Sequence, residues 1–253
     1  AQYYNKNTQM AINVDTVYKT VLLILNQQQR GYMTPDEFNK VGSQVQLNIF
    51  ERYEDDLNQQ YRMPQNDTEY ANRVKNIEQN LQFFQRTGTV TGANPFTLVP
   101  GSTTYNPNAT AIQDTVYRLG TTFLNSAELT QYAQRNEITQ LLLSPLTQPT
   151  NSFPVHLYEN NLLYIYPTTI VAPASITFSY LKKPQDITWG YVPGTLGQFL
   201  YDATLSNDFE LNVTEQANVI TRVLAYAGII INDPTIIQVA AQQVQEEEQN
   251  SKT

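Results

Sequence analysis

The chain has 253 residues, a net charge of −8 and only 15% charged residues. It contains no cysteine and a single histidine, His156, which excludes disulfides, thiolate chemistry and zinc sites built from several histidines. An acidic surface repels phosphate backbones, so the composition argues against sequence-independent DNA binding. No stretch approaches the roughly 20 consecutive apolar residues that a membrane-spanning helix needs, and no membrane partner is expected.

Two helices are predicted at the start of the chain. The segment DTVYKTVLLILN, residues 15–26, is apolar on most faces, which is typical of a buried helix. The next helix begins at TPDEF, where Thr34 is the N-cap, Pro35 occupies the first turn and Glu37 completes a capping box. Nothing interrupts it before about residue 62, so we expect a length of about 42 Å at about 1.5 Å per residue.

This second helix carries two apolar stripes and therefore needs two neighbours. The first stripe consists of Phe38, Val41, Val45 and Ile49. The second stripe, on a different face, consists of Leu47, Phe50, Leu57 and Tyr61. Two interpretations of the second stripe remain open: it packs against another part of the same chain, or it contacts an adjacent subunit.

A third helix and then a change of composition follow. Asn66 or Asp67 caps a helix predicted over residues 69–86, so residues 1–87 are expected to form an N-terminal helical part. Residues 88–113 are rich in Thr, Gly, Pro and Asn, and we expect them to form an extended loop.

The middle of the chain predicts β structure. Strands are expected at residues 115–124, 153–158, 162–167 and 175–183. The segment ENN between the second and third of these strands predicts a hairpin turn, and residues 127–146 are expected to include a short helix. We therefore expect a small antiparallel β module over residues 114–193.

Helices are predicted again at the end of the chain. Residues 212–231 and 232–249 have helical apolar spacing, and Asp233 is the expected N-cap of the second segment. Residues 194–249 would then supply C-terminal helices that complete the bundle, followed by a polar tail at residues 250–253. The predicted fold class is α+β: a helical bundle from the N- and C-terminal helices with an inserted small antiparallel β module.

The sequence contains no recognisable catalytic constellation. Carboxylates run consecutively at residues 54–56 and 246–248, and adjacent residues of a helix do not face each other across a cleft. His156 lies among apolar residues of an expected strand, which is typical of a structural histidine. No phosphate-binding loop, dinucleotide fingerprint or nucleophile elbow is present. We predict no enzyme activity and no catalytic, cofactor-binding or metal-binding residue.

The segment ITFSYLKKPQDITWGY, residues 176–191, combines an unusual set of residues. An alternating strand ends in Lys182 and Lys183, Pro184 stops it, and the only tryptophan of the chain, Trp189, follows in an expected loop. We interpret the lysine pair and Trp189 as part of a subunit interface, together with the second apolar stripe. The alternative interpretations are a solvated strand end for the lysines and an anchor within the chain for Trp189.

Tyrosine is strongly represented, with 17 residues. Tyrosine offers a large amphipathic contact area, which suits protein interfaces and sugar-binding surfaces. It also has a high β propensity and fills half-exposed strand positions. The composition does not decide between these two roles for residues such as Tyr164 and Tyr166.

Four segments, taken together and in this order, resemble virion proteins of tailed phages of the crAss-like group. They are MAINVDTVYKTVLLILNQQQRGYMTPDEFN, SPLTQPTNSFPVHLYENNLLYIYPTTI, YLKKPQDITWGYV and DFELNVTEQANVITRVLAYAGI. The resemblance covers most of residues 10–245 but not residues 88–113. It implies a head-to-tail connector, a ring or adaptor protein stacked beneath the portal in about twelve copies that close around an axis.

The resemblance also implies the partners and the place of such a protein. Its partners are copies of itself, the portal protein and other neck or tail ring proteins, and the transiting DNA passes without specific binding. It is assembled in the host cytoplasm and resides in the virion neck or tail. The alternative function is a carbohydrate- or receptor-binding tail module that uses a tyrosine-rich sheet.

Overall fold

A computed structural model describes the chain at residues 11–27, 32–62, 68–104, 111–125, 128–231, 242 and 245. The chain divides into two compact units, which are described separately. The first unit comprises Ala1–Phe83, Thr104–Thr110 and Pro184–Thr253, and the second comprises Phe84–Thr103 and Ala111–Lys183.

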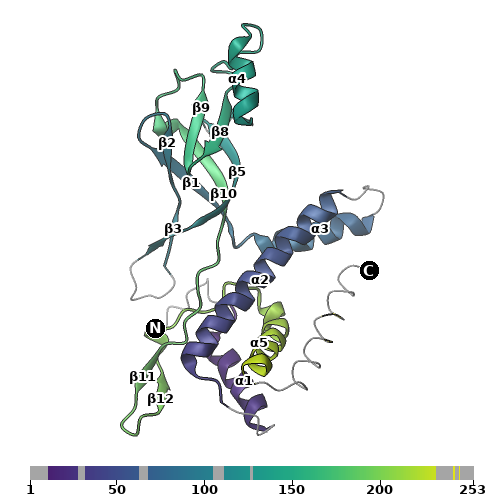
Figure 1. The fold of residues 1–253 in the computed structure, drawn as a ribbon, viewed down its shortest axis with the longest axis vertical. Coiled ribbons are helices and arrows are strands. Elements are labelled where there is room, and N and C mark those ends of the chain that lie inside the picture. Colours follow the sequence, from purple (N-terminus) through teal and green to yellow (C-terminus); the bar gives the residue numbers. More distant parts are fainter. Residues whose placement is uncertain are drawn as a thin grey trace, which may run out of the picture. The chain divides into compact units, whose positions relative to one another are not determined.

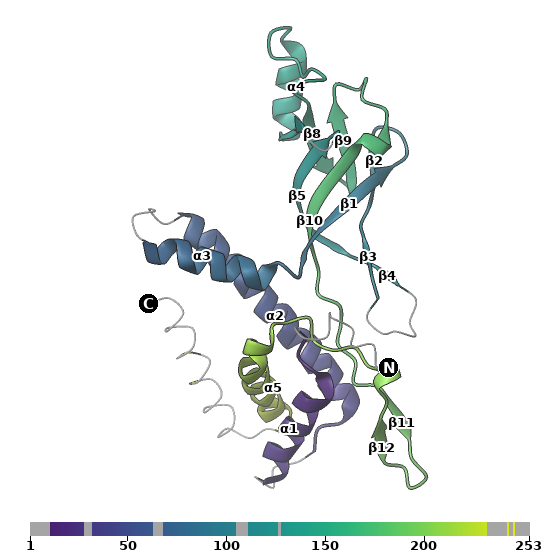
Figure 2. The same ribbon diagram turned by 180° about the vertical axis from the view of Figure 1, so that it is seen from behind.

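Helices dominate the first unit (Figures 1 and 2). They are α1 (Val14–Gln27), α2 (Pro35–Arg62), α3 (Thr68–Leu81) and α5 (Gln216–Ile231). Helix α5 packs against both α1 and α2, and α3 packs against α2. No described helix is both long enough and apolar enough to cross a bilayer.

The predicted start of α2 is confirmed. The backbone N–H and the hydroxyl of Thr34 donate to the Glu37 carboxylate at 2.9 and 2.8 Å, and the Glu37 N–H donates back to the Thr34 hydroxyl at 3.4 Å. These bonds satisfy donors that the first turn of a helix otherwise leaves free, and they lower the pKa of Glu37.

A segment that we name the strap, residues 185–189, lies along α2 and forms several of its backbone hydrogen bonds with α2 side chains. The Asn39 amide oxygen accepts from the Trp189 N–H at 2.7 Å, and the Ser43 hydroxyl accepts from the Ile187 N–H at 3.1 Å. Asn39 and Ser43 are one helical turn apart, and Trp189 and Ile187 are two residues apart on a strand-like segment. One turn of the helix therefore matches two residues of the strap. Thr188, between Ile187 and Trp189, faces the other way and pairs with Asn207 in an antiparallel bridge, so the strap is bonded to α2 on one side and to residue 207 on the other.

Gln46 continues this polar row one turn further along α2. Its amide N–H donates to the Gln185 carbonyl at 2.7 Å, and its amide oxygen accepts from the Glu210 N–H at 2.8 Å. The side chain is buried, so both backbone groups depend on it. Gly42 lies on the same part of α2, where an added Cβ would come within 2.5 Å of the Ile187 side chain.

An eight-stranded sheet forms most of the second unit, in the order β6-β5-β10-β1-β2-β9-β8-β7 (Figure 1). Its strands are β1 (Gln85–Thr91), β2 (Phe96–Val99), β5 (Val116–Leu124), β6 (Glu128–Leu129), β7 (Gln131–Tyr132), β8 (Val155–Glu159), β9 (Leu162–Tyr166) and β10 (Ile176–Lys182). A short ribbon of β3 (Ser102–Thr103) and β4 (Ile112–Gln113) and the helix α4 (Arg135–Leu143) complete the unit.

Thr130 connects the two ends of the sheet. Its N–H and its hydroxyl both donate to the Thr122 carbonyl on β5, each at 3.0 Å. Immediately after it, Gln131 and β7 pair in parallel with β8, and the Thr130 hydroxyl lies 2.8 Å from His156 Nδ1. Residues 128–132 thus form one stretch that changes partner at Thr130, and the sheet curls into a nearly closed barrel.

The interior of the barrel follows from the strand register, because directly paired residues share a face. Its core consists of Val90, Phe96, Leu124, Leu163, Ile165, Ile170, Ile176, Phe178 and Tyr180. On β8, His156 pairs with Ile165 and Tyr158 pairs with Leu163, so both side chains are on the inner face. Gly88 lies beneath Phe178, whose ring would be 2.5 Å from an added Cβ.

The outer face of β8 and β9 is covered by α4. Ile138 of the helix and Ala133 before it pack with Val155 and Leu157 in a second core cluster. The predicted hairpin between β8 and β9 is confirmed, and its turn places Asn160 at a positive φ of 53°. A positive φ at both turn residues matches the twist of the flanking strands.

The predicted fold class is wrong. The second unit is not a small insert in a helical bundle, because its nearly closed eight-stranded sheet dominates the fold. The cause is the segment 88–113, expected to be a loop, which supplies most of β1 and all of β2, β3 and β4. Strand β1 lies between β10 and β2, in the middle of the sheet.

Two further boundaries differ from the prediction. The helix predicted over residues 69–86 ends at Leu81, and β1 begins four residues later at Gln85. The region 194–211, expected to be helical or irregular, contains the strand β12 (Phe199–Tyr201) and the 3₁₀ turn η2 (Ala203–Leu205). The predicted helix 232–249 and the tail 250–253 lie outside the described residues, apart from Gln242 and Gln245, which are helical.

Replacing Gln46 by leucine tests the role of the strap. Gln46→Leu should lower the free energy of unfolding by about 2 kcal/mol, because two partly buried backbone groups lose their partners at about 1 kcal/mol or more each. Urea denaturation measures the change. The matched control Gln44→Leu, at an exposed position that bonds only Asn48, should change stability by less than about 0.5 kcal/mol. Equal effects of the two substitutions would refute this role.

Candidate functional site

The second apolar stripe of α2 is largely covered by the chain itself. Phe50 is fully buried, so its predicted place in a subunit interface is wrong. Leu47 and Leu57 are half-buried, and each leaves part of its side chain on the surface. The side chain of Tyr61 lies outside the described residues. Helix α2 packs against α3 and α5 within the first unit.

The two lysines at the end of β10 have different environments. Lys182 is only 2% exposed, and its N–H donates to the Phe84 carbonyl at 2.8 Å. It therefore cannot form the predicted interface, because no neighbouring subunit can reach it. Lys183 is exposed, and its N–H donates to the Thr115 carbonyl at 2.9 Å, which fixes its backbone beside β5.

Trp189 is an anchor within the chain and is not itself an interface residue. It is 4% exposed, and its ring lies 4.6 Å from that of Tyr18 on α1. Its indole N–H donates to the Asp15 carboxylate at 3.1 Å. The rings of Tyr191 and Tyr201 lie 6.0 and 5.7 Å from it on the other side. The loop prediction was correct for its backbone, but burial removes it from any partner.

Trp189 holds an exposed hairpin in place. The strands β11 (Tyr191–Pro193) and β12 pair in antiparallel register, and the hairpin extends away from the helices of its unit (Figures 1 and 2). Its large exposed apolar residues are Val192, Leu196, Phe199 and Leu200, which we name the hairpin surface. Leu196 at the tip is 91% exposed, which offers no benefit to an isolated chain.

A second exposed apolar group lies at the end of α4 and in the connection to β8. It consists of Leu142, Leu143, Leu146 and Phe153, which we name the helix-end surface. Leu146 is 97% exposed. The loop is held against the helix, since the Gln148 amide donates to the Leu142 carbonyl at 3.1 Å. These apolar side chains are therefore presented by ordered backbone.

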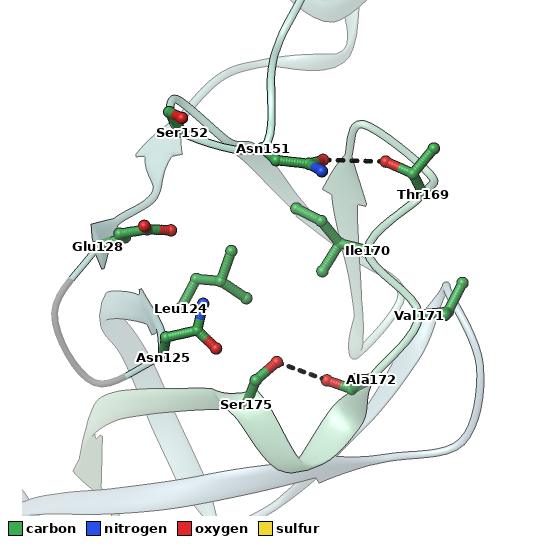
Figure 3. Close-up of a pocket in the computed structure, with 10 residues that line it drawn as sticks. All are labelled: Leu124, Asn125, Glu128, Asn151, Ser152, Thr169, Ile170, Val171, Ala172 and Ser175. Atoms are coloured by element: carbon green, nitrogen blue, oxygen red, sulfur yellow. Dashed lines mark hydrogen bonds between the residues drawn. The ribbon is translucent and has the colours of Figure 1, made fainter.

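A polar pocket of about 340 Å³ opens at one end of the barrel (Figure 3). It is lined by Leu124, Asn125, Glu128, Asn151, Ser152, Thr169, Ile170, Val171, Ala172 and Ser175. The Thr169 hydroxyl donates to the Asn151 amide oxygen at 3.0 Å, and the Ser175 hydroxyl donates to the Ala172 carbonyl at 2.8 Å. Glu128 is the only titratable side chain in the lining, so the pocket can hydrogen-bond a ligand but contains no acid–base pair.

A second hollow, which we name the seam cavity, lies beside the point where Thr130 closes the barrel. It has a volume of about 460 Å³ and is lined by Tyr117, Arg118, Leu119, Gly120, Tyr132, His156 and Tyr158. Strand β5 is paired with β6 only at Phe123 and Leu124, so these lining residues of β5 lie beyond the paired stretch. The cavity therefore lies where β6 no longer pairs with β5.

His156 has a defined orientation beside this cavity. The Thr130 hydroxyl donates to the Thr122 carbonyl, so its oxygen accepts the N–H of His156 Nδ1. The Nε2 atom then carries the lone pair. Burial lowers the pKa of His156 to about 4, although its hydrogen bond to Thr130 acts in the opposite direction. The imidazole is therefore neutral at pH 7.

None of these hollows has the geometry of a catalytic site. Among the described residues, no three His, Asp or Glu side chains lie close enough together to hold a metal ion. His156 contacts a threonine and an aromatic ring, and neither contact supplies the oriented nucleophile that a triad requires.

A scan against models of protein families finds no match, and a search of curated proteins finds none either.

The polar row of α2 was not predicted, although a signal for it exists. Asn39, Ser43 and Gln46 recur at helical spacing beside the first apolar stripe, and all three are uncharged side chains that can bond a backbone packed against the helix. The two exposed apolar surfaces were also missed, because Leu143 ends a run of three leucines and Leu196 is a single apolar residue, and neither segment has a clear periodicity that shows which side is exposed.

The buried imidazole predicts a pH dependence of stability. His156 has a pKa of about 4 when folded and about 6.5 when unfolded, so its contribution is complete above pH 6.5 and is lost as the pH falls towards 4. The loss should reach about 3 kcal/mol at about 1.4 kcal/mol per pH unit. Thermal melting between pH 7 and pH 4 measures it.

The variant His156→Asn is the comparison, since asparagine can still donate to Thr130 but does not titrate. Carboxylates titrate in both proteins and cancel in the difference. The original protein should lose more stability than the variant over this pH range, and parallel losses would contradict a neutral buried imidazole.

Proposed function

We propose that this chain is a structural virion protein that forms a ring in the portal–tail (neck) region of a tailed phage. In this proposal about twelve copies close around an axis. The ring stacks with the portal protein and other neck or tail ring proteins, and serves as a conduit for the genome and as an attachment platform for tail components. Assembly takes place in the host cytoplasm, and the protein then resides in the virion neck or tail.

The observation that carries the proposal is the pair of exposed apolar surfaces. The hairpin surface belongs to the first unit and the helix-end surface to the second. A ring is built from heterologous contacts, in which one patch of a subunit meets a different patch of its neighbour. A chain with two unlike apolar surfaces on ordered elements has what such a contact requires. Contacts with the portal or other rings can use either surface in the same way.

The charge of the chain also supports a conduit. A net charge of −8 with only 15% charged residues disfavours tight binding to phosphates. DNA that must move through a ring is best served by a wall that does not retain it. The resemblance of four sequence segments to phage connectors adds to these physical arguments but rests on the sequence alone.

The alternative function, sugar binding by a tyrosine-rich sheet, is disfavoured because the two tyrosines expected to bind the sugar are partly covered. Tyr164 and Tyr166 are half-buried and pack in the cluster beneath α4. The guanidinium of Arg135 lies 5.9 Å from the centre of the Tyr164 ring, which covers it further. These two tyrosines therefore stabilise the contact between α4 and the barrel.

Charged substitutions in the two surfaces test the proposal. Leu196→Asp and Leu143→Asp should each weaken ring formation more than tenfold, because a carboxylate placed in an apolar contact costs more than about 1.4 kcal/mol. Native mass spectrometry of the full chain, alone and with portal protein, measures the oligomer distribution.

Two control substitutions introduce the same charge near these leucines but replace a polar residue instead of an apolar one. Thr195→Asp lies next to Leu196, and Gln140→Asp lies on α4 one turn before Leu143, and both positions are exposed. Rings should persist in these controls. A chain that stays monomeric both alone and with portal protein would refute the proposal.

A further inference from the structure

The seam cavity has a chemical character that ring assembly does not explain. It lies where the strand 128–132 has left β5, so the wall of the barrel is open between β5 and β8. Its volume of about 460 Å³ lies within the roughly 300–1,000 Å³ of small-molecule sites. An opening of this size into a barrel gives a ligand access to residues of the inner face.

Aromatic rings form most of the lining. Tyr117 comes from β5, Tyr132 from β7 and Tyr158 from β8, so three strands each contribute one ring. Tyr132 is 57% exposed and lies 5.7 Å from the His156 ring, at the rim. Tyr158 belongs to the inner face, and its hydroxyl donates to Asn161 at 3.1 Å, which holds the ring in place.

A buried acceptor accompanies these rings. His156 is only 3% exposed, and the hydrogen bond of Nδ1 to Thr130 leaves Nε2 as a lone-pair nitrogen in a residue that lines the cavity. Buried polar groups of this kind are stabilised when a ligand bonds them.

We propose that the seam cavity binds one ring of a neutral saccharide. The C–H faces of a sugar pack on tyrosine rings, and a sugar hydroxyl can donate to His156 Nε2. This combination of flat apolar surfaces and a fixed acceptor is what distinguishes sugars from purely apolar ligands. A ring protein with such a site would also contact glycans, and this activity is independent of the proposed ring.

Other ligand classes fit the cavity less well. A metal ion would find one imidazole and no carboxylate in the lining. An anion would meet a chain of net charge −8, and Arg118 already interacts within the chain. A lipid tail would leave the imidazole acceptor unpaired. A planar nucleobase could stack on the same rings, so the experiment includes one.

The test titrates the full chain with maltose, cellobiose, lactose, mannobiose and N,N′-diacetylchitobiose, and with adenosine as the nucleobase probe. Saturation-transfer NMR reports contact, and isothermal calorimetry reports affinity. At least one saccharide should bind with a dissociation constant of about 1 mM or tighter. Tyr132→Ala should weaken that binding at least tenfold.

Tyr32→Ala is the matched control, since Tyr32 is 54% exposed, belongs to the first unit and is not among the residues that line the cavity. It should leave saccharide binding unchanged, and equal melting temperatures establish that both variants fold. Three results would overturn the proposal: no saccharide binding, saccharide binding that is insensitive to Tyr132→Ala, or adenosine binding that is tighter than any saccharide.

Discussion

Thr130 closes the barrel of the second unit, because it is hydrogen-bonded to both β5 and β8. Its N–H and hydroxyl donate to β5, and its hydroxyl oxygen accepts from His156 on β8. A sheet left open there would present unpaired N–H and C=O groups along two edges, which is a template for aggregation. The short strand that contains Thr130 covers part of both edges. It also sets where α4 leaves the barrel, and it leaves the seam cavity beyond its end.

The first unit solves a similar problem with side chains. Residues 185–189 run in extended form and pair with another segment only at Thr188, which bridges to Asn207, so other backbone groups of the strap need side-chain partners. Asn39, Ser43 and Gln46 supply these partners from one face of α2. Each of these side chains has the donor or acceptor that its backbone partner requires, so a residue of similar size without that group would leave the backbone group unpaired. Both units therefore depend on polar residues at positions that are usually apolar.

The sequence predicts local structure here better than long-range structure. The Thr34 capping box and the turn at residues 160–161 depend on neighbours along the chain, and both were predicted. The barrel was missed because residues 88–113 are polar and rich in glycine, and their strand character comes from pairing with β10 and β9 far along the chain. Phe50 was assigned to an interface because spacing identifies an apolar face but does not identify what covers it. The hydrogen bond of His156 to Thr130 joins residues 26 positions apart, and no local pattern signals it.

Trp189 has a consequence beyond its own burial. It packs on α1 through Tyr18 and on both strands of the hairpin through Tyr191 and Tyr201. The base of the hairpin is thereby immobilised before any encounter, and a partner that docks on Leu196 need not supply the ordering entropy of the strands. A buried residue can in this way raise the affinity of the proposed contact, because a flexible hairpin would have to be ordered at each association.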